Sequence, residues 1–103
     1  MIHIRAYTHG GKIRRIELSG HSGSAESGRD LICAGVSAVA TGLCNALDEM
    51  QCDAECMVGN NRITITTEDD SVKTQTVLET GMIQLETIRE IAEEFVQIRK
   101  TEV

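Results

Sequence analysis

Two side chains in this sequence have the types and the spacing needed for nucleophilic thiol chemistry. Cys33 stands near the start of an apolar, helix-like stretch, and His21 precedes the small-residue loop that leads into it. A thiol near a helix N-terminus gains thiolate character from the helix dipole, and a neighbouring imidazolium favours the thiolate further. The pair predicts a cysteine peptidase in which His21 is first the base and then the acid that protonates the leaving amine.

Two further polar residues lie beside this pair. Asp30 is a favourable N-cap for the expected helix, which would put Cys33 at the third helical position. The unpaired N–H groups of that first turn could donate to an oxyanion on the attacked carbonyl. Asp30 could also orient His21, although capping explains it equally well. Ser37 follows Cys33 by one helical turn on the same face.

A purely structural interpretation of these residues stays open. Free cysteine is among the most buried residue types, so Cys33 could be a small core side chain. His21 could be an ordinary loop histidine. Spacing permits contact between them without requiring it.

The remaining cysteines give no sign of metal or redox-motif chemistry. There is no Cys-x-x-Cys pair, and the spacing of Cys52 and Cys56 is too long for a zinc knuckle. Together with Cys44 they are expected to fill the core. We expect neither a metal nor a cofactor.

The apolar pattern predicts two hairpins, each followed by a helix. In chain order the expected elements are strands at 2–8 and 12–19, a helix at 30–50, strands at 52–58 and 62–67, and a helix at 70–95. Gly10-Gly11 and Asn60-Asn61 supply the hairpin turns. The polar tail at 99–103 is expected to fray.

This ββαββα order predicts an α+β fold in which two helices pack on one face of a four-stranded antiparallel sheet. The length of 103 residues suits a single domain over 1–103. Small residues beside the apolar stripe of the first helix predict close approach of another backbone there; they are Gly35, Ala38, Gly42 and Ala46.

Composition argues against several partners. The net charge is −6, and Tyr7 and Phe95 are the only aromatic residues, so nucleic-acid binding is not expected. The N-terminus has no signal-peptide pattern and no apolar run suggests a membrane span. The expected compartment is the cytosol, where thiols stay reduced.

The motif over residues 20–38 resembles the bacterial ribosomal-processing cysteine proteases, the Prp family. That family's pattern runs Gly-His-Ala, a loop ending in Gly, a basic residue, Asp, two aliphatic residues, Cys-Ala, and a Ser one turn later. This chain carries Gly20-His21, a loop over 23–28, the run from Asp30 to Ala34, and Ser37. It departs from the pattern at Ser24 and Ser27, where the family often has tyrosine.

The resemblance implies a cytoplasmic endopeptidase, a homodimer, with His21 and Cys33 as the catalytic pair. Gly20, Asp30 and Ser37 match supporting positions of the motif. The implied substrate is the precursor of bacterial large-subunit ribosomal protein number twenty-seven, whose N-terminal extension is removed. Two rivals stay open: a non-catalytic ribosome-associated binding protein, and a thiol redox sensor.

Overall fold

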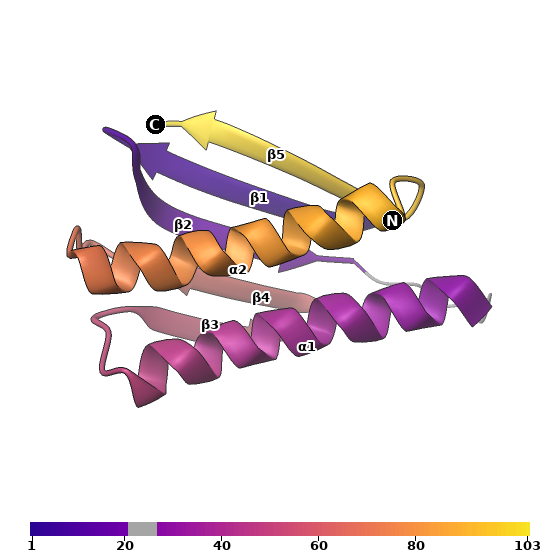
Figure 1. Ribbon diagram of the computed structural model, residues 1–103, viewed down its shortest axis with the longest axis horizontal. Coiled ribbons are helices and arrows are strands. Elements are labelled where there is room, and N and C mark those ends of the chain that lie inside the picture. The colour runs from indigo at the N-terminus through magenta and orange to yellow at the C-terminus, as the bar shows by residue number, and fades with distance from the viewer. Residues whose placement is uncertain (21–26) are drawn as a thin grey trace.

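The computed structural model describes residues 1–20 and 27–103, and within that range the side chains of residues 27–30 are not described. The elements in chain order are β1 (Ile2–His9), β2 (Lys12–Ser19), α1 (Ser27–Glu49), β3 (Glu55–Gly59), β4 (Arg62–Thr66), α2 (Val72–Ile91) and β5 (Val96–Glu102). The order is therefore ββαββαβ (Figure 1).

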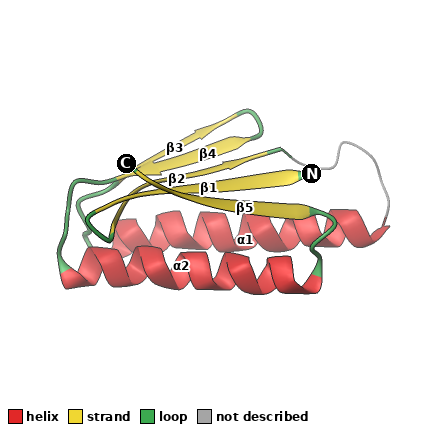
Figure 2. Ribbon diagram, turned by 90° about the horizontal axis from the view of Figure 1, so that it is seen from above, coloured by secondary structure: helices red, strands yellow, loops and turns green. Residues whose placement is uncertain are grey.

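The sheet has five strands in the order β3-β4-β2-β1-β5. Neighbouring strands are antiparallel except β1 and β5, which are parallel. Both helices cover one face of the sheet, as the apolar pattern predicted (Figure 2). The expectation of four antiparallel strands was wrong, because the sheet is mixed and has a fifth strand at its edge.

The fifth strand is the segment whose end was expected to fray. The Val96 side chain is buried, and the Ile2 N–H donates to the carbonyl of Phe95 at 2.8 Å, which starts the parallel pairing. Farther along, the Glu102 carboxylate accepts from the Thr8 hydroxyl at 2.7 Å and from the Gly10 N–H at 2.8 Å. The tail is ordered because it pairs with β1, a strand far away in the sequence. No local sequence pattern in the tail predicts this pairing.

The helix boundaries differ from those expected. Helix α1 begins at Ser27, before Asp30, so Asp30 lies inside the first turn and is not the N-cap. Helix α2 begins after Ser71, whose hydroxyl oxygen accepts from the Thr74 N–H at 3.3 Å. It ends before Phe95.

The core lies between the sheet and the helices. Strands β1 and β2 contribute Ile4 and Ile16, which have no exposed surface. The stripes expected on the two helices supply most of the rest; the buried members are Val36, Leu43, Leu47, Leu78, Met82 and Leu85. Met50, the last residue of the helix expected at 30–50, lies just beyond α1 and is 47 % exposed.

The second hairpin is less covered than the sequence pattern predicted. Strand β3 begins at Glu55, three residues later than expected, and forms one edge of the sheet. The alternating pattern of the expected strand at 52–58 puts Val58 on the same face as Cys56, but Val58 is 73 % exposed because a hollow separates it from α1. Helix α1 thus leaves open space between itself and β3.

The helices pack closely at Gly81 of α2 and not at Gly42 of α1. A Cβ placed on Gly81 of α2 would lie 2.6 Å from a methyl of Leu43 on α1. A Cβ on Gly42 would meet nothing within 4 Å. The missing side chain at Gly81 therefore lets α1 approach, whereas Gly42 faces open space.

Helix α1 has the composition of a membrane span over part of its length. Among the described residues, the segment Leu31–Glu49 is long and apolar enough to cross a membrane, with a mean hydropathy of 1.5. A core helix of a soluble protein has the same composition, and Val36, Leu43 and Leu47 of this segment are buried in the core.

Candidate active site

Gly20 fixes the point at which the chain leaves β2 for residue 21. Its φ of +81° is in the left-handed region, and a Cβ there would lie 2.5 Å from the carbonyl oxygen of Met1. Its N–H donates to the carbonyl of Asn61 at 3.2 Å. Only glycine fits this backbone between the N-terminus and the tip of the β3–β4 hairpin.

A hollow of about 250 Å³ opens beside Gly20. Ser37 and Arg62 are among the polar residues of its lining, and they come from α1 and β4. Apolar side chains from five elements also line it; they are Ile2, Leu18, Val36, Ala40, Val58 and Ile63. The hollow therefore has an apolar wall and polar groups at the end of β2, the place where His21 follows in sequence.

Cys33 lies on α1, one turn before Ser37. Its side chain is half-buried and packs against the hydrophobic core. Residues four apart share one helix face, so Cys33 is on the face that borders the hollow through Ser37. A half-buried Cys33 agrees with both interpretations. It can be a core side chain, or a thiol that core contacts hold in position.

The earlier start of α1 changes the expected environment of Cys33. It stands in the second turn of the helix, so its backbone N–H lies beyond the unpaired N–H groups of the helix start. The effect of the helix dipole falls off within the first turn. The expected position of Cys33 at the third helical residue was wrong, which leaves activation of the thiol chiefly to a neighbouring base.

The other predicted residues are placed in part. Gly20 and Ser37 come together in the lining of the hollow, and Cys33 is one helical turn away. His21 lies outside the described residues, as do Ser22 and Ser24. Asp30 is in the first turn of α1, in the range whose side chains are not described.

The other three cysteines gather at the opposite end of α1. Cys44, Cys52 and Cys56 line a separate hollow of about 490 Å³ and pack against the core, as expected of core-filling thiols. Burial raises the pKa of the Cys56 thiol to about 12, with the hydrogen-bonded Cys44 as the next cause. Among the described residues, no group of three or more His, Cys, Asp or Glu is placed to hold a metal ion.

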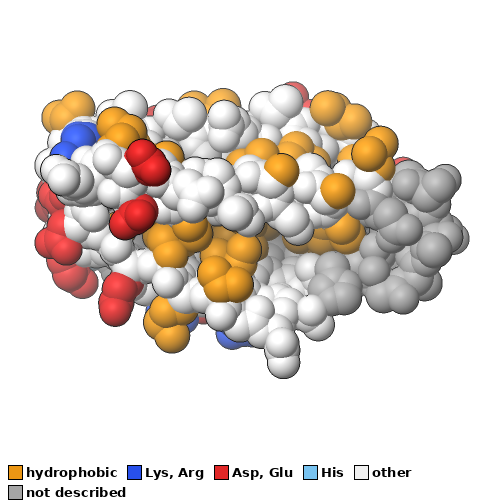
Figure 3. Space-filling view, turned by 90° about the horizontal axis from the view of Figure 1, so that it is seen from below, with side chains coloured by type: hydrophobic (Ala, Val, Ile, Leu, Met, Phe, Trp, Pro, Cys, Tyr) orange, Lys and Arg blue, Asp and Glu red, His pale blue; other side chains and the backbone are white. Residues whose placement is uncertain are grey.

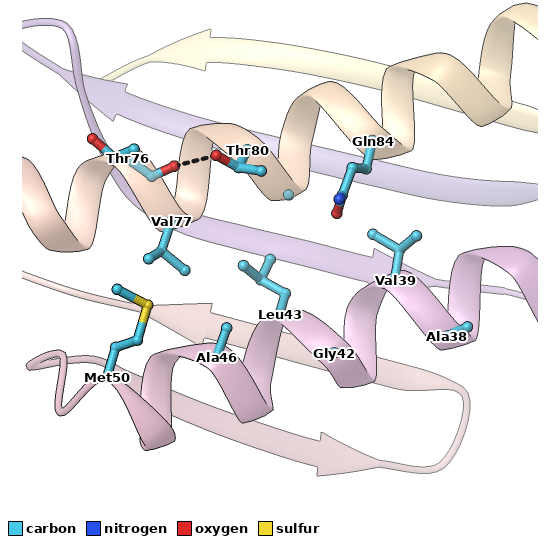
Figure 4. A pocket seen from close by; sticks show the side chains of 11 residues that line it. Ala38, Val39, Gly42, Leu43, Ala46, Met50, Thr76, Val77, Thr80 and Gln84 are labelled. Atoms are coloured by element: carbon cyan, nitrogen blue, oxygen red, sulfur yellow. Dashed lines mark hydrogen bonds between the residues drawn. The ribbon is translucent and has the colours of Figure 1, made fainter.

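A third hollow, of about 580 Å³, lies between the two helices (Figure 4). Its lining includes Ala38 and Gly42 from α1, Met50 just after the end of α1, and Thr80 and Gln84 from α2. None of the residues that line it in the described part of the chain is ionisable or a cysteine. This hollow therefore has no thiol, acid or base for the chemistry expected of Cys33 and His21.

Comparison with known proteins supports this assignment of chemistry. The family described as "Cysteine protease Prp" matches residues 1–97. No curated protein gives a significant match.

Solved structures extend the likeness over the whole fold. A protein called SMU.848 from Streptococcus mutans has a TM-score of 0.88 at 26% identity, covering 100% of this chain and 96% of its own. The essential ribosomal processing protease Prp from S. aureus, with a covalently linked product peptide, has a TM-score of 0.84 at 25% identity, covering 98% of this chain and 100% of its own. The same protease with a substrate peptide has a TM-score of 0.85 at 24% identity and the same coverage. The chain belongs to the Prp family and is a cysteine protease.

Proposed function

We propose that this protease removes the N-terminal extension of a ribosomal protein precursor, that of bacterial large-subunit protein number twenty-seven. The S. aureus relative is described as a ribosomal processing protease. The net charge of −6 suits an encounter with a basic ribosomal protein. We further propose a single domain over residues 1–103, acting as a homodimer in the cytoplasm without binding nucleic acid or membrane.

One observation carries the choice of nucleophile: Cys33 stands on α1 one turn before Ser37, which lines a hollow together with Gly20, and Cys33 is not in the lining of the hollow that holds the other three thiols. Cys44, Cys52 and Cys56 all line the other hollow. His21 directly follows Gly20 in the sequence, and Gly20 lines the same hollow as Ser37. Cys33 and His21 form the catalytic pair of this proposal.

The reaction proceeds in two steps. The Cys33 thiolate attacks the scissile carbonyl, and the imidazolium of His21 gives its proton to the leaving amine, which leaves an acyl-enzyme. His21, now neutral, takes a proton from water, whose oxygen attacks the thioester and releases the acid and the thiolate. Ser37 and Gly20 support the site, and Asp30 either orients His21 or serves the helix start alone.

The test is incubation of the precursor with wild-type protein and with His21→Ala, reading product masses and precursor affinity. We expect wild type to release the extension as one peptide. His21→Ala should bind the precursor with similar affinity but cleave it about a hundredfold or more slowly. Binding without cleavage by wild type would favour a non-catalytic binding protein and contradict the proposal.

A further inference from the structure

Three thiols share one hollow at the end of α1 that lies away from Cys33. Cys44 comes from α1, Cys52 from the connection that follows, and Cys56 from the edge strand β3. Asp48 of α1 also lines this hollow. Figure 3 shows this side of the molecule, with hydrophobic side chains in the hollowed middle of the face and acidic side chains gathered at one end.

Cys44 and Cys56 are the pair in contact. Their side chains hydrogen-bond one another, although they belong to different elements. Both are half-buried and pack against the hydrophobic core, so the core sets their positions. A disulfide joins residues whose Cβ atoms are about 3.5–4.5 Å apart, and two thiols already in contact need little movement to reach that geometry.

Cys56 is a poor nucleophile at neutral pH. Burial, then the hydrogen bond to Cys44, raises the pKa of the Cys56 thiol to about 12, so Cys56 keeps its proton at neutral pH. Only the thiolate is a nucleophile, so Cys56 is poorly suited to make the first attack on an oxidant. Cys56 then acts as the second, slower thiol.

We propose that Cys44 and Cys56 form a reversible disulfide that ties α1 to the edge strand β3. The oxidant is a small disulfide or a hydroperoxide. With a small disulfide, the Cys44 thiolate attacks one sulfur and releases one small thiolate, which gives a mixed disulfide. Cys56 then gives up its proton and attacks the Cys44 sulfur, and the second small thiolate leaves. The protein pair is oxidised by two electrons, and the small disulfide is reduced to two thiols.

The bond would connect two parts of the fold that are otherwise weakly joined. Strand β3 is an edge strand that pairs with β4, and a hollow lies between β3 and the end of α1. Closing the segment between residues 44 and 56 restricts the unfolded chain, which stabilises the folded state. We expect the oxidised protein to unfold roughly 10 °C above the reduced protein.

The experiment treats the reduced full-length protein with oxidised glutathione, then alkylates the remaining thiols and measures intact mass. Wild type should close one internal bond with the loss of two hydrogen atoms. Cys33, the activated thiol of the proposed site, should separately take up one glutathione, and Cys52 should remain alkylatable. Cys52→Ser is the matched control from the same hollow, and it should close the bond as wild type does. Cys44→Ser and Cys56→Ser should stop at mixed disulfides.

Peptide mapping needs a protease that cleaves after acidic residues, because trypsin leaves residues 30–62 and all four cysteines in one piece. Cleavage after Glu49 and Glu55 separates the three thiols of the hollow. Thermal unfolding of each reduced variant establishes that it is folded. The proposal is overturned if oxidised wild type keeps all four thiols, or if Cys56→Ser still closes an internal bond.

Discussion

The backbone N–H of Gly20 donates to the carbonyl oxygen of Asn61 at 3.2 Å, which ties the residue before His21 to the tip of the β3–β4 hairpin. On its other side, Gly20 lies so close to the Met1 carbonyl that no Cβ fits. The direction in which the chain leaves β2 is thus set by backbone contacts. This relationship makes Gly20 a positioning residue for the proposed catalytic pair.

Gly20→Ala should therefore harm both stability and activity. A left-handed backbone costs an alanine about 1–2 kcal/mol, and the contact with Met1 adds to that cost. We expect a loss of roughly 3 kcal/mol in the free energy of unfolding, measured by urea titration. Displacement of the following residue should slow cleavage about a hundredfold.

Gly11→Ala is the matched control, because Gly11 has a φ of +78° but open space around its absent Cβ. It should lose only the backbone cost of about 1–2 kcal/mol and keep its cleavage rate. If the two variants behave alike, Gly20 does not position the site.

Gly42 and Gly81 both line the hollow between the helices, but replacing each by alanine should change the free energy of unfolding in opposite directions. Gly81→Ala places a methyl against Leu43, which is itself buried, and should lower the free energy of unfolding by about 1–2 kcal/mol. Gly42→Ala meets nothing within 4 Å and should raise it by up to about 1 kcal/mol through helix propensity. Chemical denaturation of both variants measures the difference; stabilisation by Gly81→Ala would contradict the packing described here.

The raised pKa of Cys56 makes stability depend on alkaline pH. The folded value of about 12 lies above the unfolded value of about 8.5, so the folded state holds this proton more tightly. Its contribution is complete below about pH 8.5 and is lost as pH rises toward 12. Urea titrations across that window should show falling stability in wild type and a flatter profile in Cys56→Ala; identical slopes would show that the thiol does not titrate as described.

The four thiols should differ in their rates of alkylation at neutral pH. Cys33 should react first, because His21 favours its thiolate in the proposed site, and Cys56 should be slow because it keeps its proton. Limited iodoacetamide treatment of reduced protein, with fragmentation of the labelled peptides, gives the order. The control is His21→Ala, in which Cys33 should lose its lead; a Cys33 that never leads argues against an activated thiolate.

Local patterns were enough to predict most of the fold. The hairpin turns, both helices and their placement on one face of the sheet follow from apolar periodicity and turn residues. The fifth strand could not be predicted from local patterns. It forms because residues near the C-terminus pair with β1, which lies at the other end of the sequence. The start of α1 was missed because Asp30 is as acceptable inside a first turn as at a cap.

Sequence reasoning also separated Cys33 from the other thiols through its neighbours Gly20, His21 and Ser37. It could not show that Cys44 meets Cys56, since that contact joins a helix to a strand beyond the intervening turn. The sequence spacing of Cys52 and Cys56 did not indicate this contact, because the neighbour of Cys56 is Cys44.

The most direct test of the central claim is the rate at which Cys33→Ala cleaves the ribosomal precursor, compared with Cys44→Ala from the same helix. Single-turnover cleavage followed by intact mass measures both. The proposed mechanism predicts that Cys44→Ala cleaves at about the wild-type rate, whereas Cys33→Ala is slower by about a thousandfold or more. Cleavage by Cys33→Ala at the wild-type rate would contradict the assignment of Cys33 as the nucleophile.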